Sequence, residues 1–297
     1  MRFLIFLAII FSVITMLLIE NTTVFGQAIP TTDELLNKAF ELNKEGKYNE
    51  GVSILNGILV SEPDNITALH YRSTAHIGLE QFDKAKADIE RIFALRPQPS
   101  GGILYNYGVA LSGTGDYEEA IQFFDMIDDK DHNYFNAKNM KGIALLELSR
   151  FDEAIENFDI VLKDNPDNVK ALLHKGLALS NLGNYGEALN LIYNVLSIDP
   201  KNVRARNAEQ STLNLKGLSL LYDESKPEEA ITYFKKALAN DPRDPNAAAY
   251  LSMAESELTK KQLINTVNSV YVAWGVSLGG IAFSIYAYFY PRKQKER

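Results

Sequence analysis

The chain has 297 residues, of which 46% are hydrophobic and 23% are charged, a composition typical of a folded globular protein. This composition excludes a wholly disordered chain, a collagen-like fibre and a membrane protein with many spans. The formal net charge of −8 argues against sequence-independent binding to nucleic acid, and the absence of cysteine excludes disulfides, thiolate metal sites and cysteine nucleophiles.

The first 28 residues have the order of a secretory signal peptide. Arg2 precedes an almost unbroken apolar run from Phe3 to Ile19, and a polar stretch with small residues follows from Glu20 to Ala28. We expect cleavage after Gly26 or Ala28. The alternative is an uncleaved N-terminal anchor, because 17 residues are long for the apolar part of a signal and short for a membrane span.

The middle of the chain repeats itself. A tetrapeptide with an aromatic residue first and a small residue last, such as Tyr117–Ala120, recurs six times, with Pro227 in place of the aromatic residue in the last copy. An apolar residue follows four positions later, and a proline stands eight positions after that in five of the six copies. A small residue stands twelve positions before the end of the tetrapeptide in the first five copies. This regularity predicts one structural unit per copy.

The spacing within a copy predicts two antiparallel helices. Apolar residues recur at intervals of three and four, which is the pattern of one helix face. Gly46, Gly115 and Gly183 stand between the two helices, where a left-handed cap favours glycine. Paired small residues such as Gly142 and Ala154 are expected to let the two helices approach closely, and the proline closes the unit.

This pattern resembles the tetratricopeptide repeat (TPR) family over residues 32 to 244. The resemblance implies an all-α fold, a TPR α-solenoid whose helical hairpins stack into a right-handed superhelix. Repeats are expected at 32–65, 66–99, 101–134, 135–168, 169–202 and 203–244, and the insertion in the last predicts a longer helix or a kink. Residues 245–263 are expected to form a capping helix. His132 replaces the proline of the third repeat.

A second apolar segment follows the repeats. Val267 to Tyr290 holds 24 residues without a charge, enough for a helix to cross a hydrocarbon core of about 30 Å. The tail at 291–297 is basic, and basic residues beside a span stay on the cytoplasmic side. The sequence therefore predicts a transmembrane helix at 267–290, a cell-membrane location and a repeat domain outside the cytoplasm. Gly275 and Gly279 form a G-x-x-x-G pair that would permit a homodimer or pairing with a partner subunit.

The TPR resemblance also implies that the first helix of each repeat lines a concave groove that binds a peptide segment or a partner helix. The residues expected to face this groove are Asn37, His70, Tyr71, Thr74, Tyr105, Asn106, Asn136, Asn139, Lys170, His174 and Asn214. The set is polar and nearly uncharged, and asparagine both donates and accepts hydrogen bonds, which favours an extended peptide as the ligand.

Enzyme activity is not expected, because the chain has no phosphate loop, H-E-x-x-H or G-x-S-x-G motif. No cofactor or metal site is expected either. The leading hypothesis is a membrane-anchored, extracytoplasmic scaffold with proteins as partners and no nucleic acid. Two alternatives stay open: an architectural subunit of a membrane complex without an exchangeable ligand, and a cytoplasmic tail-anchored TPR adaptor. Asn65 begins a glycosylation sequon, whose use the sequence leaves open.

Overall fold

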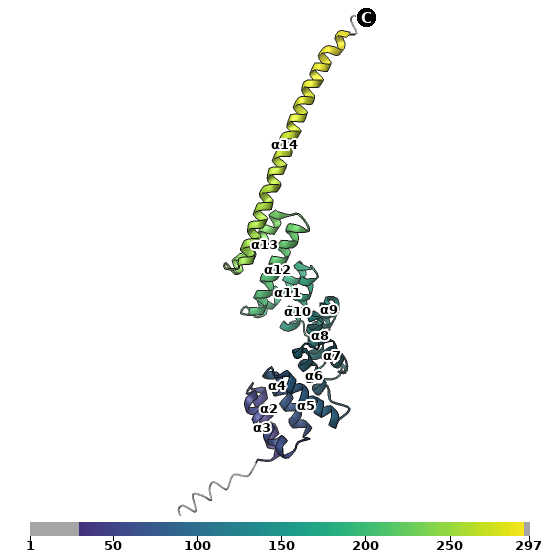
Figure 1. The fold of residues 1–297 in the computed structure, drawn as a ribbon, viewed down its shortest axis with the longest axis vertical. Coiled ribbons are helices and arrows are strands. Elements are labelled where there is room, and N and C mark those ends of the chain that lie inside the picture. The colour runs from purple at the N-terminus through teal and green to yellow at the C-terminus, as the bar shows by residue number, and fades with distance from the viewer. Residues whose placement is uncertain (1–29, 294–297) are drawn as a thin grey trace, which may run out of the picture. The chain divides into compact units, whose positions relative to one another are not determined.

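The computed structural model describes residues 30–293, with side chains for residues 30–272 and 274. Within this range every regular element is an α-helix and no β-strand occurs. The thirteen helices, labelled α2 to α14 in Figure 1, confirm the all-helical repeat fold that the sequence predicts. The predicted signal peptide and residues 294–297 of the basic tail lie outside the described residues.

The chain divides into two compact units at Asn133 and Tyr134. The first unit contains α2 (Thr32–Lys44), α3 (Tyr48–Ser61), α4 (Ile66–Gly78), α5 (Phe82–Leu95), α6 (Gly101–Thr114) and α7 (Tyr117–Asp125). The second contains α8 (Tyr134–Glu147), α9 (Phe151–Asp164), α10 (Val169–Asn181), α11 (Tyr185–Ile198), α12 (Val203–Tyr222), α13 (Pro227–Asn240) and α14 (Pro245–Lys293). Within each unit every helix packs on the next, and the first helices of successive hairpins also contact one another.

Each of the six hairpin turns contains one residue in the left-handed region of the backbone. These residues are Gly46, Glu80, Gly115, Ser149, Gly183 and Ser225, with φ between 53° and 88°. The three glycines confirm the sequence prediction. The other three turns adopt the same conformation without glycine, although it costs an L-residue roughly 1–2 kcal/mol. The packing of the two helices therefore imposes the turn, and glycine only lowers its cost.

A glycine in the first helix of several hairpins makes room for an aromatic ring of the second. A Cβ atom built on Gly142 of α8 would lie 2.5 Å from Cε1 of Phe158 in α9, and Gly108 has the same relation to Phe124. The sequence suggested that such glycines serve the approach of small residues. At Gly176 a Cβ would lie 3.2 Å from Cγ1 of Ile192 and 3.4 Å from the carbonyl oxygen of Ala188. In all three hairpins the atom nearest to the added Cβ belongs to the large apolar side chain of the second helix, and the backbone of the small residue comes close only at Gly176.

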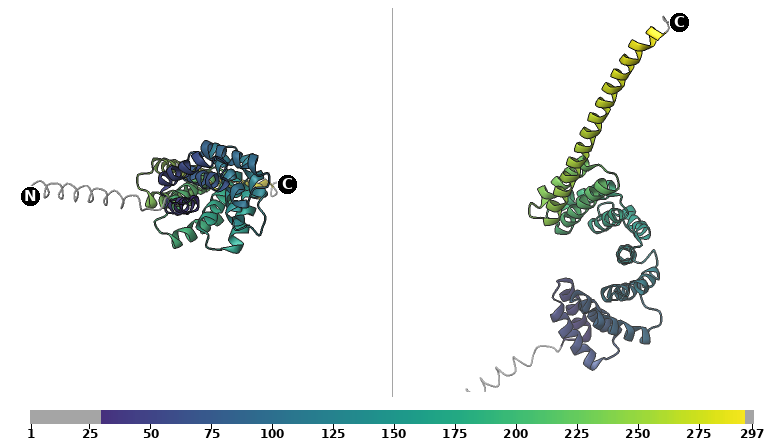
Figure 2. Two further views of the ribbon diagram at one scale, coloured as in Figure 1. Left: turned by 90° about the horizontal axis from the view of Figure 1, so that it is seen from below. Right: turned by 45° about the horizontal axis from the view of Figure 1, so that its top comes forward.

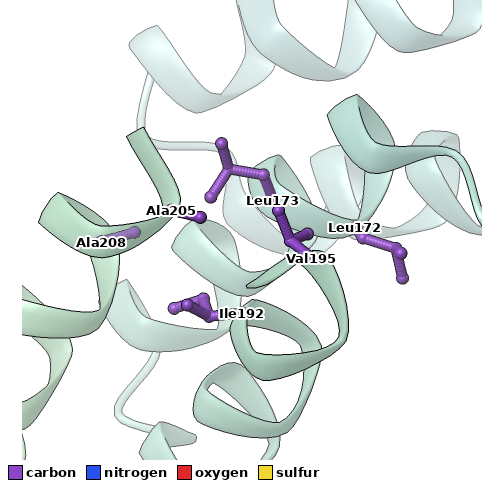
Figure 3. Packing of buried hydrophobic residues seen from close by; sticks show 6 residues of the cluster. All are labelled: Leu172, Leu173, Ile192, Val195, Ala205 and Ala208. Atoms are coloured by element: carbon purple, nitrogen blue, oxygen red, sulfur yellow. The ribbon is translucent and has the colours of Figure 1, made fainter. Parts of the chain in front are cut away.

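The apolar core is shared between successive hairpins. In the second unit one cluster takes its buried side chains from α10, α11 and α12, and each of these residues is at most 5% exposed. Figure 3 shows them: Leu172 and Leu173, Ile192 and Val195, and Ala205 and Ala208. A single hairpin therefore has no complete core of its own, which is why repeats of this kind are stable only when stacked.

Two helices depart from the regular length. α7 has 9 residues, whereas α5 and α9 at the equivalent position have 14. It ends at Asp125, ahead of the segment in which His132 replaces the repeat's proline. α12 has 20 residues, so the insertion in the sixth repeat lengthens its first helix.

The last helix is one unbroken element of 49 residues, from Pro245 to Lys293 (Figure 2). Its start packs on α12 and α13 through the buried Ala247 and Ala254. The sequence predicted a capping helix, a short link and a separate span. No glycine or proline lies between Pro245 and Gly275, and the helix therefore continues through the expected link. Among the described residues, no helix has the length and apolar character that crossing a membrane requires.

Candidate protein-binding site

Five predicted groove residues lie on α4 and α6, the first helices of two successive hairpins in the first unit. Helix α4 carries His70, Tyr71 and Thr74, and helix α6 carries Tyr105 and Asn106. Asn106 is buried, at 8% exposure, whereas the other four are half-buried. The surface formed by α4 and α6 therefore presents aromatic and polar side chains with restricted freedom.

Aromatic packing holds the exposed part of this surface. The ring centroid of Tyr71 lies 5.4 Å from that of Phe40 and 6.0 Å from that of His70. The ring of Tyr105 lies 6.2 Å from that of Phe124. Burial lowers the pKa of the His70 imidazole, so this ring is mainly neutral at pH 7. Burial also raises the pKa of the Tyr105 hydroxyl, which remains a hydrogen-bond donor at neutral pH.

Side-chain hydrogen bonds connect the first helices to one another, and we call them inter-repeat polar bridges. Asn43 of α2 donates from Nδ2 to the carbonyl oxygen of Tyr71 in α4, at 2.8 Å. Asn106 of α6 donates from Nδ2 to Oγ1 of Thr74 in α4, also at 2.8 Å. Thr74 in turn donates to the carbonyl oxygen of His70. The bridges fix α2, α4 and α6 in register through buried polar groups.

In the second unit the predicted residues differ in their access to solvent. Asn136 on α8 and Lys170 on α10 are exposed. Asn139 is buried, at 7% exposure, and its Oδ1 atom has no hydrogen-bond partner among the described residues. The side chains of Asn136 and Lys170 are therefore accessible from solvent, whereas Asn139 belongs to the packing between helices.

His174 of α10 is held from two sides. Its ring stacks on that of Phe158, with centroids 5.8 Å apart and an interplanar angle of 20°. Its Nδ1 atom lies 2.7 Å from the carbonyl oxygen of Lys170, so Nδ1 carries the proton and donates. Burial lowers the pKa of the His174 imidazole, and a neutral ring fits this arrangement.

Asn214 takes part in a polar cluster between α12 and the start of α14. Oδ2 of Asp244 accepts hydrogen bonds from Nε2 of Gln210, at 2.5 Å, and from Nδ2 of Asn214, at 3.1 Å. Its Oδ1 atom accepts from the backbone N–H groups of Asn246 and Ala247. The bond from Gln210 is the largest of the effects that lower the pKa of Asp244, which stays ionised at neutral pH.

The sequence did not predict a role for several residues that connect the first helices. Asn43, Gln210 and the pair Thr212 and Ser180, whose hydroxyls lie 3.2 Å apart, connect first helices but were not expected to have a role. Their signal in the sequence is a polar residue at a helix position that the repeat pattern would bury. The structure also brings no three His, Cys, Asp or Glu side chains together as metal ligands within the part of the chain that it describes. The surroundings of Gly275 and Gly279 lie outside the described side chains.

Comparison with known proteins agrees with this architecture. The family model for the tetratricopeptide repeat matches residues 72–133, 139–203 and 215–263. No curated protein matches the chain.

Three solved structures are similar to this chain. YrrB, described as a TPR protein with an unusual peptide-binding site, is 19% identical over 60% of this chain and 91% of its own, with a TM-score of 0.49. MamA from AMB-1 is 22% identical over 56% and 98%, with a TM-score of 0.49. A TPR protein from Parabacteroides merdae ATCC 43184 is 18% identical over 75% and 98%, with a TM-score of 0.48. Because the family model covers more than half of the residues, the chain belongs to the tetratricopeptide repeat family.

Proposed function

We propose that the protein is a scaffold whose first-helix surfaces bind an extended segment of a partner protein. The inter-repeat polar bridges carry this proposal. They hold successive first helices in one register, so the side chains between them are already ordered before a partner arrives. Ordering of side chains is a large part of the free-energy cost of association, and a pre-ordered surface avoids it.

The exposed groups of these helices suit a peptide backbone. Asn136 offers both a donor and an acceptor, Lys170 offers donors, and Tyr71 and Tyr105 add flat apolar area with a polar end. An extended peptide presents an N–H and a carbonyl group at each residue and needs partners for both. The surface therefore supports recognition of backbone and side chains together.

Site-specific photocrosslinking tests this assignment. A photoreactive residue at Asn136 or Lys170 should capture the same partner from cells, since both positions are exposed on first helices of one unit. Asn190 on the second helix α11 is an exposed asparagine and provides the matched control. Capture at Asn190 alone, or equal capture at all three positions, contradicts the proposal. Invariable co-purification with the same fixed subunits would favour an architectural subunit.

We further propose that α14 anchors the scaffold to a membrane, with the repeats on the extracytoplasmic side. Val267 to Tyr290 contains no charged residue, and the described part of this segment exposes Tyr271, Val272 and Trp274 at 66–73%. Exposed apolar side chains in such a group require cover by lipid or by another protein. The uncharged sequence and the basic tail after it favour lipid and a cytoplasmic C-terminus.

Two measurements test the anchor. After alkaline extraction of membranes the full chain should stay in the pellet, whereas a chain that stops at Thr266 should enter the supernatant. External protease should digest the repeats in intact cells. Release of the full chain contradicts the anchor, and protection of the repeats contradicts its orientation.

Pairing through Gly275 and Gly279 is tested separately. Replacing both glycines with leucine should abolish a crosslinked dimer without releasing the chain from the membrane.

A further inference from the structure

The second hairpin carries an ionisable pair where the other hairpins carry mostly apolar residues. His76 is only 7% exposed and stands three positions after the small residue of its first helix. The residues at the equivalent position of the other five hairpins are Leu42, Leu111, Leu145, Leu179 and Leu220. Asp88, at 6% exposure, has as its equivalents Ile54, Phe123, Asn157, Leu191 and Tyr233.

Asp88 is bound to an arginine of the preceding helix. Arg72 donates from Nε to Oδ2 of Asp88, at 2.9 Å, and from Nη2 to Oδ1, at 2.5 Å. A third bond runs from Nη1 of Arg72 to Oδ1 of Asn56 in α3, at 2.7 Å. The two-point contact neutralises the carboxylate and holds the guanidinium in one orientation.

His76 completes the cluster as a neutral ring. Oε1 of Gln81 is an acceptor that receives a bond from Lys84 at 3.1 Å, and it lies 3.0 Å from Nδ1 of His76. Nδ1 therefore carries the proton of the ring. Burial lowers the pKa of the His76 imidazole, so the ring is mainly neutral at pH 7 and Nε2 is unprotonated. Nε2 lies 4.0 Å from Oδ2 of Asp88, where the two acceptors form no hydrogen bond.

Stability alone does not account for this cluster. Replacing a buried ion pair by apolar residues of similar size is often neutral or stabilising, and the chain itself places leucine at the position of His76 in every other hairpin. A departure of this kind from a repeat's own pattern is expected where a site has a function. The cluster is therefore a candidate site in its own right.

An open pocket of about 460 Å³ lies directly over the cluster. Its polar lining comes from Asn49 and Asn56 of α3 and Lys84 of α5, together with Arg72, His76 and Asp88 of the cluster. This volume lies within the range of small-ligand sites. At about 100° per residue, Arg72 and His76 lie roughly 200° and 240° around α4 from His70. The pocket therefore opens on the side of α4 that faces away from the proposed peptide surface.

We propose that this pocket is a second binding site, which takes a carboxylate group. Arg72 uses three of its five N–H donors and Lys84 uses one of three, so both have donors left. The amide groups of Asn49 and Asn56 add N–H donors to the lining. The positive charge of Arg72 neutralises the negative charge of Asp88. The positive charge of Lys84 then has no counterpart in the pocket lining, so a ligand group with a single negative charge would neutralise it. The carboxylate comes from an acidic side chain of a partner or from a free small acid.

Ligand-observed saturation-transfer NMR on the full chain tests the site with two probes. The probes are succinamate, which carries one carboxylate, and the peptide Gly-Glu-Gly capped at both ends, and their uncharged counterparts are succinamide and capped Gly-Gln-Gly. Both acidic probes or one of them should receive saturation, with a dissociation constant of about 1 mM or lower. Binding of succinamate alone assigns the site to a free acid, and binding of the peptide alone assigns it to a protein side chain.

Two lysine variants locate the binding. Lys84→Ala should weaken it about tenfold, because a charged hydrogen bond is lost. Lys38→Ala removes an exposed lysine of α2 outside the pocket and should leave the affinity unchanged. The proposal is overturned if neither acidic probe binds, if the uncharged probes bind equally well, or if Lys84→Ala has no effect. None of these results depends on the first-helix surface, so they neither support nor contradict the proposed peptide site.

Discussion

The ring of Phe158 lies so close to Gly142 that a Cβ atom on the glycine would be 2.5 Å from ring atom Cε1. Both residues are buried, and the Phe158 ring also stacks on the ring of His174 in α10. The distance between the two helices of this hairpin is therefore set by the absence of a single methyl group.

Gly142→Ala should lower the free energy of unfolding by about 1–3 kcal/mol, because overpacking outweighs the gain in helix propensity. Gly57 in α3 is the matched control, since a Cβ there would meet nothing within 4 Å. Gly57→Ala should raise stability by about 0.5–1 kcal/mol. Urea denaturation followed by circular dichroism measures both. Equal effects of the two substitutions would contradict the packing described for Phe158.

The hairpin turns give a pair of substitutions with opposite signs. Ser149 has φ of 58° and Gly183 has φ of 82° at the equivalent position of the next hairpin. Ser149→Gly should stabilise the protein by about 0.5–1 kcal/mol, whereas Gly183→Ser should destabilise it by about 1 kcal/mol. Thermal denaturation of the two variants provides the comparison, and a shift of both melting temperatures in the same direction would show that the turns are not equivalent.

Asn65 caps α4, and its replacement should lower the stability of the first unit. Its Oδ1 accepts a hydrogen bond from the backbone N–H of Ala68 at 2.9 Å, whereas Ser100 at the start of α6 makes no such side-chain bond. Asn65→Ala should cost about 1 kcal/mol and Ser100→Ala less than about 0.5 kcal/mol. Amide hydrogen exchange at the start of α4 and α6 measures the difference locally. A larger increase in exchange rate at α6 in Ser100→Ala than at α4 in Asn65→Ala would contradict this prediction.

Stability should fall as the pH drops below neutrality. Burial is the main reason that the pKa of His76 lies below its ordinary value of 6.5, and it also lowers the pKa values of His70 and His174. Around His76, Asp88 of α5 opposes this shift, Arg72 of α4 and Lys84 of α5 add to it, and α3 contributes no charge to the pocket lining.

The sign follows from proton linkage. The unfolded chain binds protons near pH 6.5, before the folded histidines do, so stability is complete above that pH and is lost progressively below it. His76→Leu, which restores the residue of the other hairpins, should make the loss between pH 7 and pH 5 smaller. Urea denaturation at a series of pH values tests this. An unchanged pH slope in the variant would mean that the pKa of His76 is the same in the folded and the unfolded chain.

Much of this fold can be predicted from the sequence because each hairpin depends on local patterns that recur. The glycines between helices, the aromatic residue that opens the second helix and the small residue of the first each indicate one local feature. Features that arise between hairpins are harder to predict. Asn43 and Gln210 are ordinary polar residues until the neighbouring helix places a carbonyl or carboxylate group beside them. The site residue Asn139 was expected to face a ligand, but its burial depends on packing that no local pattern records.

The unbroken course of α14 gives the last hairpin a mechanical role. At 1.5 Å per residue, 49 residues form a rod of roughly 70 Å, and its first turns are packed against α12 and α13. A link of flexible residues would let the repeats swing freely about whatever holds the C-terminal end. A continuous helix instead couples the orientation of its distal part to that of the hairpins packed on its first turns.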